Sequence, residues 1–279
     1  MLALDVPHLL RRFGLSPKKS LGQNFLVDET ALAKVAAAAE LTPDDAVLEI
    51  GPGLGSLTRH LASAARRVVA VELDGDLLPA LRHVLQPYSN VEIIHGDILQ
   101  LHPSSFILPP YKVVANIPYY ITSAVVRHLL EAEARPTLIV LTIQREVAER
   151  ICAGPGDLSL LAVSVQFYSR PRLAARLLAG AFYPRPQVDS AVVKLEVLPQ
   201  PAVAVADADS FFAVVKAGFS QKRKQLRNSL SGGLRLDPAQ ADDLLNRAGI
   251  DPKRRAETLT LDEWGALTQA FAAFAQSRG

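Results

Sequence analysis

The tetrapeptide Asn116-Ile117-Pro118-Tyr119 has residue types suited to a flat base that carries an amine. The exocyclic amine of adenine is a poor nucleophile because its lone pair is delocalised into the ring. Two acceptors on its N–H bonds, the side-chain oxygen of Asn116 and the backbone carbonyl of Pro118, would favour a tetrahedral, nucleophilic geometry. Proline also stiffens the loop, and the ring of Tyr119 offers a stacking face worth about 1–3 kcal/mol. Asn116, Pro118 and Tyr119 are therefore candidate catalytic residues, and an ordinary strand-to-loop turn is the alternative.

A glycine-rich segment, Glu49-Ile50-Gly51-Pro52-Gly53-Leu54-Gly55, follows an apolar run. Glycines let the backbone turn tightly and approach a ligand closely. The spacing is G-x-G-x-G with an acid just before it, which is closer to an S-adenosylmethionine loop than to the G-x-G-x-x-G loop of dinucleotide enzymes. Gly51 and Gly53 are therefore candidate cofactor-binding residues. A tight turn without a ligand is the alternative.

Two acids at the ends of later runs are candidates for the same cofactor. A carboxylate at Glu72 could accept both ribose hydroxyls, which disfavours a cofactor with a 2′-phosphate. Asp97 could accept a hydrogen bond from the adenine amino group. Taken alone, Glu72 could also be a solvated acid and Asp97 a turn residue.

The elements that must position these residues form an alternating pattern. Apolar, β-branched runs separated by helical segments such as Leu57–Ala65 and Leu77–Leu85 predict a doubly wound α/β fold with a parallel sheet. Ligands bind such sheets at the carboxyl ends of the strands, so Glu49, Glu72, Asp97 and Asn116 should line one crevice. The predicted strands are Ala46–Ile50, Val68–Glu72, Val91–His95, Lys112–Asn116, Thr137–Ile143, Ala162–Tyr168 and Ala191–Val197.

The C-terminal part has a different pattern. The last two predicted strands are expected to pair antiparallel at one edge of the sheet, because their connection is short and rich in proline. A linker follows, and beyond it only helical spacing occurs, over Ser210–Leu230, Gln240–Ala248 and Leu261–Gln276. Asp237 and Pro238 suit the N-cap and first position of a helix. We predict an α/β domain over residues 1–200 and a small helical domain over 207–279.

Composition excludes several classes of protein. The 279 residues carry 30 Lys+Arg and 28 Asp+Glu, so the chain is not a globally basic nucleic-acid coat protein. No apolar run approaches the about 20 residues of a membrane span, and the N-terminus does not resemble a signal peptide, so we expect a cytoplasmic protein. A single cysteine, Cys152, and six scattered histidines predict no metal site.

A basic stretch occurs near the end of the Ser210–Leu230 segment. Lys222, Arg223, Lys224 and Arg227 occur in a segment without acids. A solvated helix face is the usual explanation of such a run, and phosphate binding is the alternative, since each neutralised phosphate adds about 0.7–0.9 to the salt dependence of binding. Lys18 and Lys19 form a second small basic patch.

Asn-Ile-Pro-Tyr resembles the Asn-Leu-Pro-Tyr motif of the ribosomal RNA adenine N6,N6-dimethyltransferases, with Ile117 as a conservative departure. Ser20–Leu26 (SLGQNFL), Phe182–Ser190 (FYPRPQVDS) and Phe219–Leu230 (FSQKRKQLRNSL) resemble three further motifs of that family, in order along the chain. The resemblance implies a Rossmann-like methyltransferase sheet with an all-helical, RNA-binding C-terminal domain. It also implies dimethylation of two adjacent adenosines in the 3′-terminal hairpin loop of 16S rRNA, and a role in small-subunit assembly.

The same resemblance implies residue roles. Residues 1–28 would form an arm that closes over the site, in which Asn24 and Leu26 contact the cofactor. Phe182 would pack against the target adenine opposite Tyr119, which would offset part of the cost of extruding a base. S-adenosyl-L-methionine would bind Gly51, Glu72, Asp97 and Asn116, and small-subunit rRNA would contact the basic stretch of a monomeric enzyme.

Three alternatives remain. The related large-subunit rRNA methyltransferases, which confer antibiotic resistance, are disfavoured by the Val-Asp-Ser ending of the proline loop. Methyltransferases of DNA adenine or protein glutamine usually have a second proline where this chain has Ile117. A binding factor that has lost catalysis is disfavoured by intact Glu72, Asp97, Asn116 and Tyr119.

Overall fold

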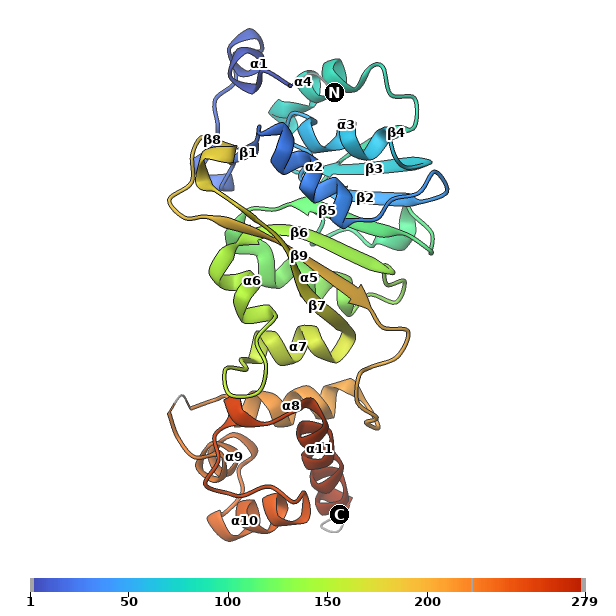
Figure 1. The fold of residues 1–279 in the computed structure, drawn as a ribbon. Coiled ribbons are helices and arrows are strands. Elements are labelled where there is room, and N and C mark those ends of the chain that lie inside the picture. The colour runs from blue at the N-terminus through green and yellow to red at the C-terminus, as the bar shows by residue number, and fades with distance from the viewer. Residues whose placement is uncertain (1–2, 222, 277–279) are drawn as a thin grey trace. The chain divides into compact units, whose positions relative to one another are not determined.

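The computed structural model describes residues 3–221 and 223–276 (Figure 1). Packing divides the chain into two units, one made of Met1–Ala148 with Arg170–Val197 and the other of Glu149–Ser169 with Leu198–Gly279. The helical unit thus includes a segment from the middle of the chain, which differs from the single boundary expected between residues 200 and 207. The reason is packing, because Leu158, Val163 and Phe167 belong to the apolar cluster of the C-terminal helices.

The α/β unit contains a seven-stranded sheet in the order β4-β3-β2-β5-β6-β9-β7. The first five strands in this order pair parallel, and β9 pairs antiparallel with β6. The chain runs from β2 outward to β4 and then returns to β5 on the other side of β2, so the strand order reverses between β2 and β5. The strands are β2 (Ala46–Ile50), β3 (Arg67–Glu72), β4 (Val91–His95), β5 (Lys112–Asn116), β6 (Leu138–Gln144), β7 (Ser169–Leu177) and β9 (Ser190–Val197).

Helices connect and cover these strands. Side chains of α2 and α3 pack on Val47, Val114 and Val192 of three different strands, so both helices lie on the same face of the sheet. A separate two-stranded sheet joins β1 (Phe25–Leu26) to β8 (Phe182–Tyr183). The helices of this unit are α1 (Val6–Arg12), α2 (Glu29–Ala38), α3 (Ser56–Ala62), α4 (Leu78–Leu85) and α5 (Thr122–Leu130), and α6 (Arg145–Ile151) crosses the boundary between the units. Short 3-10 turns are η1 (Lys19–Leu21), η2 (Gly75–Leu77), η3 (Pro103–Ser105), η4 (Tyr119–Ile121) and η5 (Ala179–Ala181).

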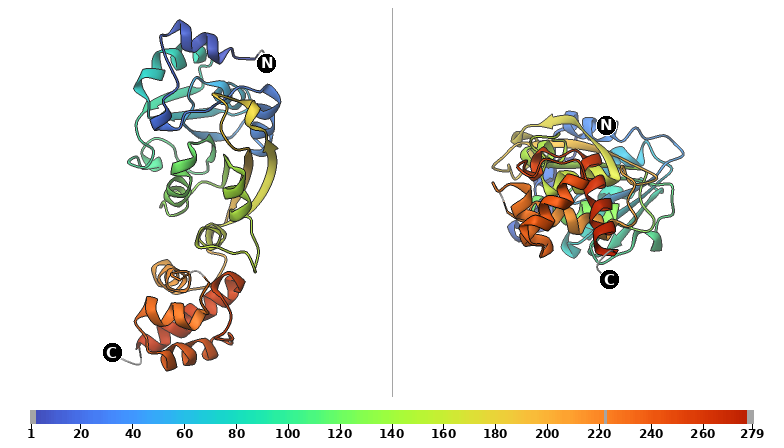
Figure 2. Two further views of the ribbon diagram at one scale, coloured as in Figure 1. Left: turned by 90° about the vertical axis from the view of Figure 1, so that its left-hand side faces the viewer. Right: turned by 90° about the horizontal axis from the view of Figure 1, so that it is seen from below.

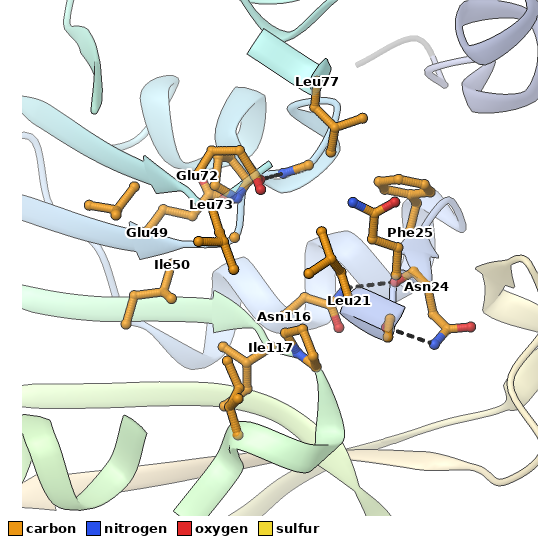
Figure 3. Close-up of a pocket in the computed structure, with 18 of the residues that line it drawn as sticks. Leu21, Asn24, Phe25, Glu49, Ile50, Glu72, Leu73, Leu77, Asn116 and Ile117 are labelled. Atoms are coloured by element: carbon orange, nitrogen blue, oxygen red, sulfur yellow. Dashed lines mark hydrogen bonds between the residues drawn. The ribbon is translucent and has the colours of Figure 1, made fainter. Parts of the chain in front are cut away.

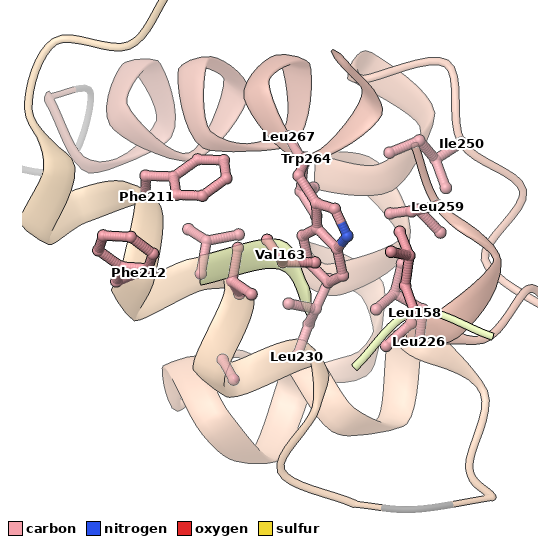
Figure 4. Packing of buried hydrophobic residues seen from close by; sticks show 14 of the residues in the cluster. Leu158, Val163, Phe211, Phe212, Leu226, Leu230, Ile250, Leu259, Trp264 and Leu267 are labelled. Atoms are coloured by element: carbon pink, nitrogen blue, oxygen red, sulfur yellow. The ribbon is translucent and has the colours of Figure 1, made fainter. Parts of the chain in front are cut away.

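The helical unit has its own aromatic core (Figure 4). The rings of Phe167 and Phe211 stack with centroids 4.3 Å apart, and Trp264 is fully buried. A Cβ placed on Gly218 would lie 2.4 Å from the Trp264 ring, so glycine allows these helices to approach. The elements are α7 (Leu160–Tyr168), α8 (Ala208–Gly218), α9 (Leu226–Leu234), α10 (Pro238–Arg247), η6 (Ala256–Thr258) and α11 (Leu261–Gln276). As predicted, Asp237 caps α10 and accepts a hydrogen bond from Gln240 N.

Two predictions for this half of the chain are wrong. The run 162–168 is a helix and not a strand, because Ser159 caps its N-terminus and its apolar residues enter the helical core. β9 pairs antiparallel with β6, and its neighbour at the edge of the sheet is β7, which begins directly after this helix. The segment Ser210–Leu230 is not one helix, since α8 ends at Gly218 and α9 begins at Leu226. None of the described helices combines the length and the hydropathy needed to cross a membrane.

Candidate functional site

A cavity opens at the carboxyl ends of the parallel strands, where the strand order reverses (Figure 3). Glu49, Glu72, Asp97 and Asn116, which end β2, β3, β4 and β5 or follow them directly, all line this cavity. The prediction that these four residues share one crevice is confirmed. Its empty volume is ≈ 1070 Å³, with the open mouth included.

The glycine-rich turn forms one wall of the cavity. Gly51, Gly53 and Gly55 have φ values of 69°, 60° and 88°, a backbone conformation that favours glycine. The N–H of Gly53 donates to Glu72 Oε2 at 2.9 Å, and the N–H of Asp74 donates to Glu72 Oε1 at 2.8 Å. Two backbone donors thus fix the carboxylate that the sequence predicts to bind ribose hydroxyls, and each oxygen keeps a lone pair for a ligand.

Glu49 is a buried acid in the wall of this cavity. It is 1% exposed, and its Oε2 atom has no hydrogen-bond partner. Burial, with the negative charge of Glu72 added to it, raises the pKa of Glu49 to about 8. Burial also raises the pKa of Glu72, although the N–H groups of Asp74 and Gly53 oppose this effect. Ionising a buried carboxyl group whose Oε2 lacks a hydrogen bond is costly, and a positively charged ligand would reduce that cost.

Asp97 has a local role and faces the cavity as well. Its Oδ1 accepts a hydrogen bond from Leu99 N at 3.0 Å, which is the turn role considered from the sequence. Asp97 nevertheless lines the cavity next to Gly96 and Ile98. Hydroxyl acceptors, an acceptor for an amino group and a buried acid with a free Oε2 atom together suit a nucleoside that carries positive charge.

Asn116 is oriented by the N-terminal arm. Its Nδ2 atom donates to the backbone oxygen of Asn24 at 3.1 Å. A carbonyl oxygen can only accept, so the Asn116 atom facing it is the nitrogen, and Oδ1 is left as a free acceptor. The carbonyl of Pro118 accepts one hydrogen bond, from Ile121 N at 3.2 Å, and keeps a second lone pair. Both atoms predicted to accept from an amine are therefore available.

Tyr119 and Phe182 both line the cavity, from different parts of the chain. The Tyr119 hydroxyl lies 2.8 Å from Ser190 Oγ, and Ser190 is fully buried at the start of β9. Burial raises the pKa of Tyr119, and the hydrogen bond with Ser190 opposes this effect. Phe182 is 4% exposed and packs with Leu26 in the core of the unit. The two rings predicted to hold a base thus border the same space.

The N-terminal arm is fastened over the cavity at two places. Leu26 pairs with Phe182 across the β1–β8 sheet. At the other place, Asp74 accepts hydrogen bonds from Lys18 Nζ at 2.6 Å and from Gln23 Nε2 at 2.8 Å. Although burial opposes its ionisation, these hydrogen bonds hold the pKa of Asp74 below its ordinary value. We call the set Lys18, Gln23, Asp74 and Asp76 the arm latch; Lys18 also binds Asp76 at 2.7 Å.

The described part of the basic stretch is divided between a turn and the start of helix α9. Lys222 lies outside the described residues. Arg223, with φ 70°, and Lys224 are exposed in the turn between α8 and α9. Arg227, in the first turn of α9, forms an ion pair with Asp242 at 3.4 Å. The structure therefore leaves Arg223 and Lys224 as exposed cations and gives Arg227 an internal partner.

The sequence interpretation missed several residues of the site. Ser190 belongs to the Val-Asp-Ser ending, and its burial beside Tyr119 requires the fold to be known. Asp74 follows Glu72 by two positions, and Gln23 precedes Asn24, but nothing in the spacing of either shows that they meet. Lys18 was grouped with a basic patch and is instead neutralised. Within the described residues, no group of three or more His, Cys, Asp and Glu could hold a metal ion.

Comparisons with known proteins agree with this geometry. Residues 14–273 match the model of the family described as ribosomal RNA adenine dimethylase. Ribosomal RNA small subunit methyltransferase A of Dehalococcoides mccartyi is 48% identical, with 97% of this chain and 94% of the relative covered. The protein of the same name from Moorella thermoacetica is 44% identical, with coverage of 94% and 95%.

Solved structures give the same result for the fold. The crystal structure of the 23S rRNA methyltransferase ErmE has a TM-score of 0.72 and 31% identity, and the match covers 89% of this chain and 100% of that one. A dimethyladenosine transferase from Plasmodium falciparum has a TM-score of 0.76 at 24% identity, with 90% and 98% covered. The predicted Rossmann-like sheet with a helical C-terminal region is confirmed. The family match over most of its length shows that the chain belongs to the ribosomal RNA adenine dimethylase family and is a methyltransferase.

Proposed function

We propose that this methyltransferase uses S-adenosyl-L-methionine to dimethylate N6 of two adjacent adenosines in the 3′-terminal hairpin loop of 16S rRNA. The orientation of Asn116 carries the proposal, because its free Oδ1 atom is the acceptor that an adenine amine requires. Relatives at 44% and 48% identity are named small-subunit methyltransferases, which supports the small subunit as the substrate and a role in its assembly. A ribosomal substrate would place the protein in the cytoplasm, and we expect it to act as a monomer.

The cofactor would occupy the end of the cavity bordered by the glycine-rich turn. Glu72 would accept the ribose hydroxyls, Asp97 the adenine amino group, and the arm residues Asn24 and Leu26 would cover the ligand. The buried acid Glu49, whose Oε2 atom lacks a hydrogen bond, would face its positive charge. When bound, the cofactor supplies a methyl group on a sulfonium, a good leaving group, so the protein needs no strong base.

The base would occupy the other end of the cavity. Tyr119 and Phe182 would hold the extruded adenine between their rings, at an unstacking cost of a few kcal/mol. Asn116 Oδ1 and the Pro118 carbonyl would accept from its amine and direct the nitrogen lone pair toward the methyl group. Phosphates would be contacted in part by Lys222, Arg223 and Lys224.

The test is methyl transfer from labelled S-adenosylmethionine to unmethylated small subunits, with large subunits and DNA in parallel. Dimethyladenosine from small subunits alone is the expected product. Label in large subunits would favour the second candidate function, a large-subunit rRNA methyltransferase. The 31% identity to the 23S rRNA methyltransferase ErmE is the observation behind this candidate. Tight binding to small subunits with no transfer to any substrate would instead indicate a binding factor.

A further inference from the structure

We infer that helices α1 and α4 form a second RNA-contacting surface, which binds backbone phosphates next to the cofactor end of the cavity. The surface consists of Arg11 and Arg12 at the end of α1 and Arg82 and His83 near the end of α4. This inference rests on the proposed function for the identity of its partner. We refer to these four residues as the α1–α4 surface.

The two helices are held together by packing and by contacts between the basic residues themselves. Figures 1 and 2 show α1 beside α4, and Val6 and Leu9 of α1 share an apolar cluster with Ala80 of α4. Arg12 Nη1 lies 3.3 Å from His83 Nε2. The Phe13 ring lies 5.6 Å from the His83 ring. The surface is therefore a fixed arrangement on folded elements and not a flexible basic tail.

The cations of this surface have no internal counter-ions. Other cations of the α/β unit form ion pairs: Lys18 with Asp74, Arg67 with Glu92, Lys112 with Asp45, Arg127 with Glu131, Arg172 with Glu40 and Lys194 with Glu40. Among the residues that the structure describes, no carboxylate pairs with Arg11, Arg12 or Arg82, and all three are exposed.

Acids are also scarce around them. The segment 77–90, which contains all of α4, has no Asp or Glu. The acid at the start of α1, Asp5, caps that helix through His8 N, and Asp76 is paired with Lys18. Positive charge on this face is thus not cancelled locally, which raises the local concentration of a polyanion.

The position of the surface indicates which polyanion it meets. The apolar cluster under α1 includes Phe25, Leu54 and Leu77, and these three residues also line the cavity. An RNA whose base enters that cavity must bring its neighbouring phosphates close to the cavity walls. Arginine suits phosphate because its planar guanidinium binds two oxygens at once. The α1–α4 surface therefore fits the backbone of the RNA that flanks the methylated loop.

The experiment compares the full-length variant Arg11→Gln/Arg12→Gln/Arg82→Gln with wild type for binding to unmethylated small subunits between 50 and 200 mM KCl at constant magnesium. If each arginine contacts one phosphate, the slope of log affinity against log salt should fall by about 2–2.7. The methylation rate at saturating subunits should stay near that of wild type, since no residue of the cavity is changed.

Arg66→Gln is the matched control, to be compared with Arg82→Gln alone. Arg66 is also exposed, but it precedes β3 and so lies at the amino end of the parallel strands, away from the cavity. Its removal should leave the slope unchanged. An unchanged slope and affinity in the triple variant, with wild type binding and methylating normally, would overturn the inference while the proposed function stands. Binding with the expected slopes but without methyl transfer by wild type would reject the proposed function alone.

Discussion

The amide of Asn116 is oriented by a backbone oxygen, and the carboxylate of Glu49 is left without any hydrogen bond at Oε2. These two residues end neighbouring strands and serve different chemistry. Asn116 presents a hydrogen-bond acceptor for a neutral amine. Glu49 holds its proton at neutral pH because burial raises its pKa to about 8. Each gives a prediction at the scale of a single side chain.

Replacing Asn116 by Ala should lower the rate of methyl transfer by about 100-fold or more, the size of losing a transition-state hydrogen bond in a dry site. Affinity for small subunits should change little, because the aromatic walls remain. Single-turnover kinetics beside filter binding would measure both. Turnover near that of wild type would remove Asn116 from the proposed mechanism.

The buried carboxyl of Glu49 should make the ligand-free protein less stable as the pH rises. A folded pKa of about 8, above the ordinary 4.5, means that the folded state binds the proton more tightly. The stability gained is complete below pH 4.5 and is lost as the pH rises through 8. Glu49→Gln should therefore raise the melting temperature at pH 8.5 relative to wild type, by about 2–4 °C for each kcal/mol.

Thermal unfolding of both proteins at pH 6 and pH 8.5 is the measurement. The difference in melting temperature between the two proteins at each pH isolates the contribution of Glu49. A melting difference that is the same at both pH values would show that Glu49 does not titrate there.

At the scale of elements, the strands with their polar ends were predictable, and the contacts that fasten the arm were not. The apolar, β-branched runs that alternate with helical segments predict β2 to β5 correctly. The topology of a parallel sheet then brings Glu49, Glu72, Asp97 and Asn116 together at one edge. A short apolar run has no such signal, because a buried helix and a buried strand both read as continuous hydrophobic sequence. For this reason the prediction of a strand over residues 162–168 is wrong. The arm latch joins residues about 50 positions apart, as in the Gln23–Asp74 bond, and no local pattern encodes that contact.

The arm latch should control how long a ligand stays in the cavity. Asp74→Asn should raise the dissociation constant of S-adenosylhomocysteine about 10-fold, a change of about 1.4 kcal/mol. The physical reason is that the buried Asp74 accepts from Lys18 with one oxygen and from Gln23 with the other, whereas an amide has one acceptor oxygen and no charge. Calorimetric titration measures the affinity, and limited proteolysis of the arm reports its release.

Asp76→Asn is the control for this prediction. Asp76 binds the same lysine, but its side chain is 68% exposed, and exposed ion pairs contribute little. The affinity of Asp76→Asn for S-adenosylhomocysteine should stay close to that of wild type. Equal effects of the two substitutions would mean that general charge near Lys18, and not the buried latch, retains the ligand.

At the scale of the whole molecule, the small net charge of +2 hides an uneven distribution. Several cations of the α/β unit are paired. Among the described residues, no counter-ion is found at the arginines of the α1–α4 surface or, in the turn between α8 and α9, at Arg223 and Lys224. The sequence indicated the turn between α8 and α9 from its run of basic residues, but it could not show that Arg227 is neutralised by Asp242. The sequence did not indicate the α1–α4 surface, since Arg11, Arg12 and Arg82 come together only in the fold.

Replacing Lys222, Arg223 and Lys224 by Ala should weaken RNA binding for every sequence and flatten its salt dependence, because phosphate contacts are independent of sequence. Arg227→Ala is a different kind of change. It should lower the melting temperature of the helical unit more than it changes the salt slope, since Arg227 already has a partner. Binding to small subunits and to an unrelated RNA hairpin across a salt series is the measurement. A salt slope equal to that of wild type in the triple variant would leave the turn as a solvated surface.

The pairing of Leu26 with Phe182 has a consequence for the order of events in catalysis. Leu26 belongs to the arm that would act as a lid over the methyl donor, and Phe182 would form the wall behind the target adenine. Both lie in one small sheet, formed by β1 and β8. A lid that lifts to exchange a spent donor must pull on that wall, so we expect the half-modified nucleotide to leave at the same moment. Two methyl groups would then be added in two separate visits, and singly methylated RNA should accumulate in free solution before the doubly methylated product.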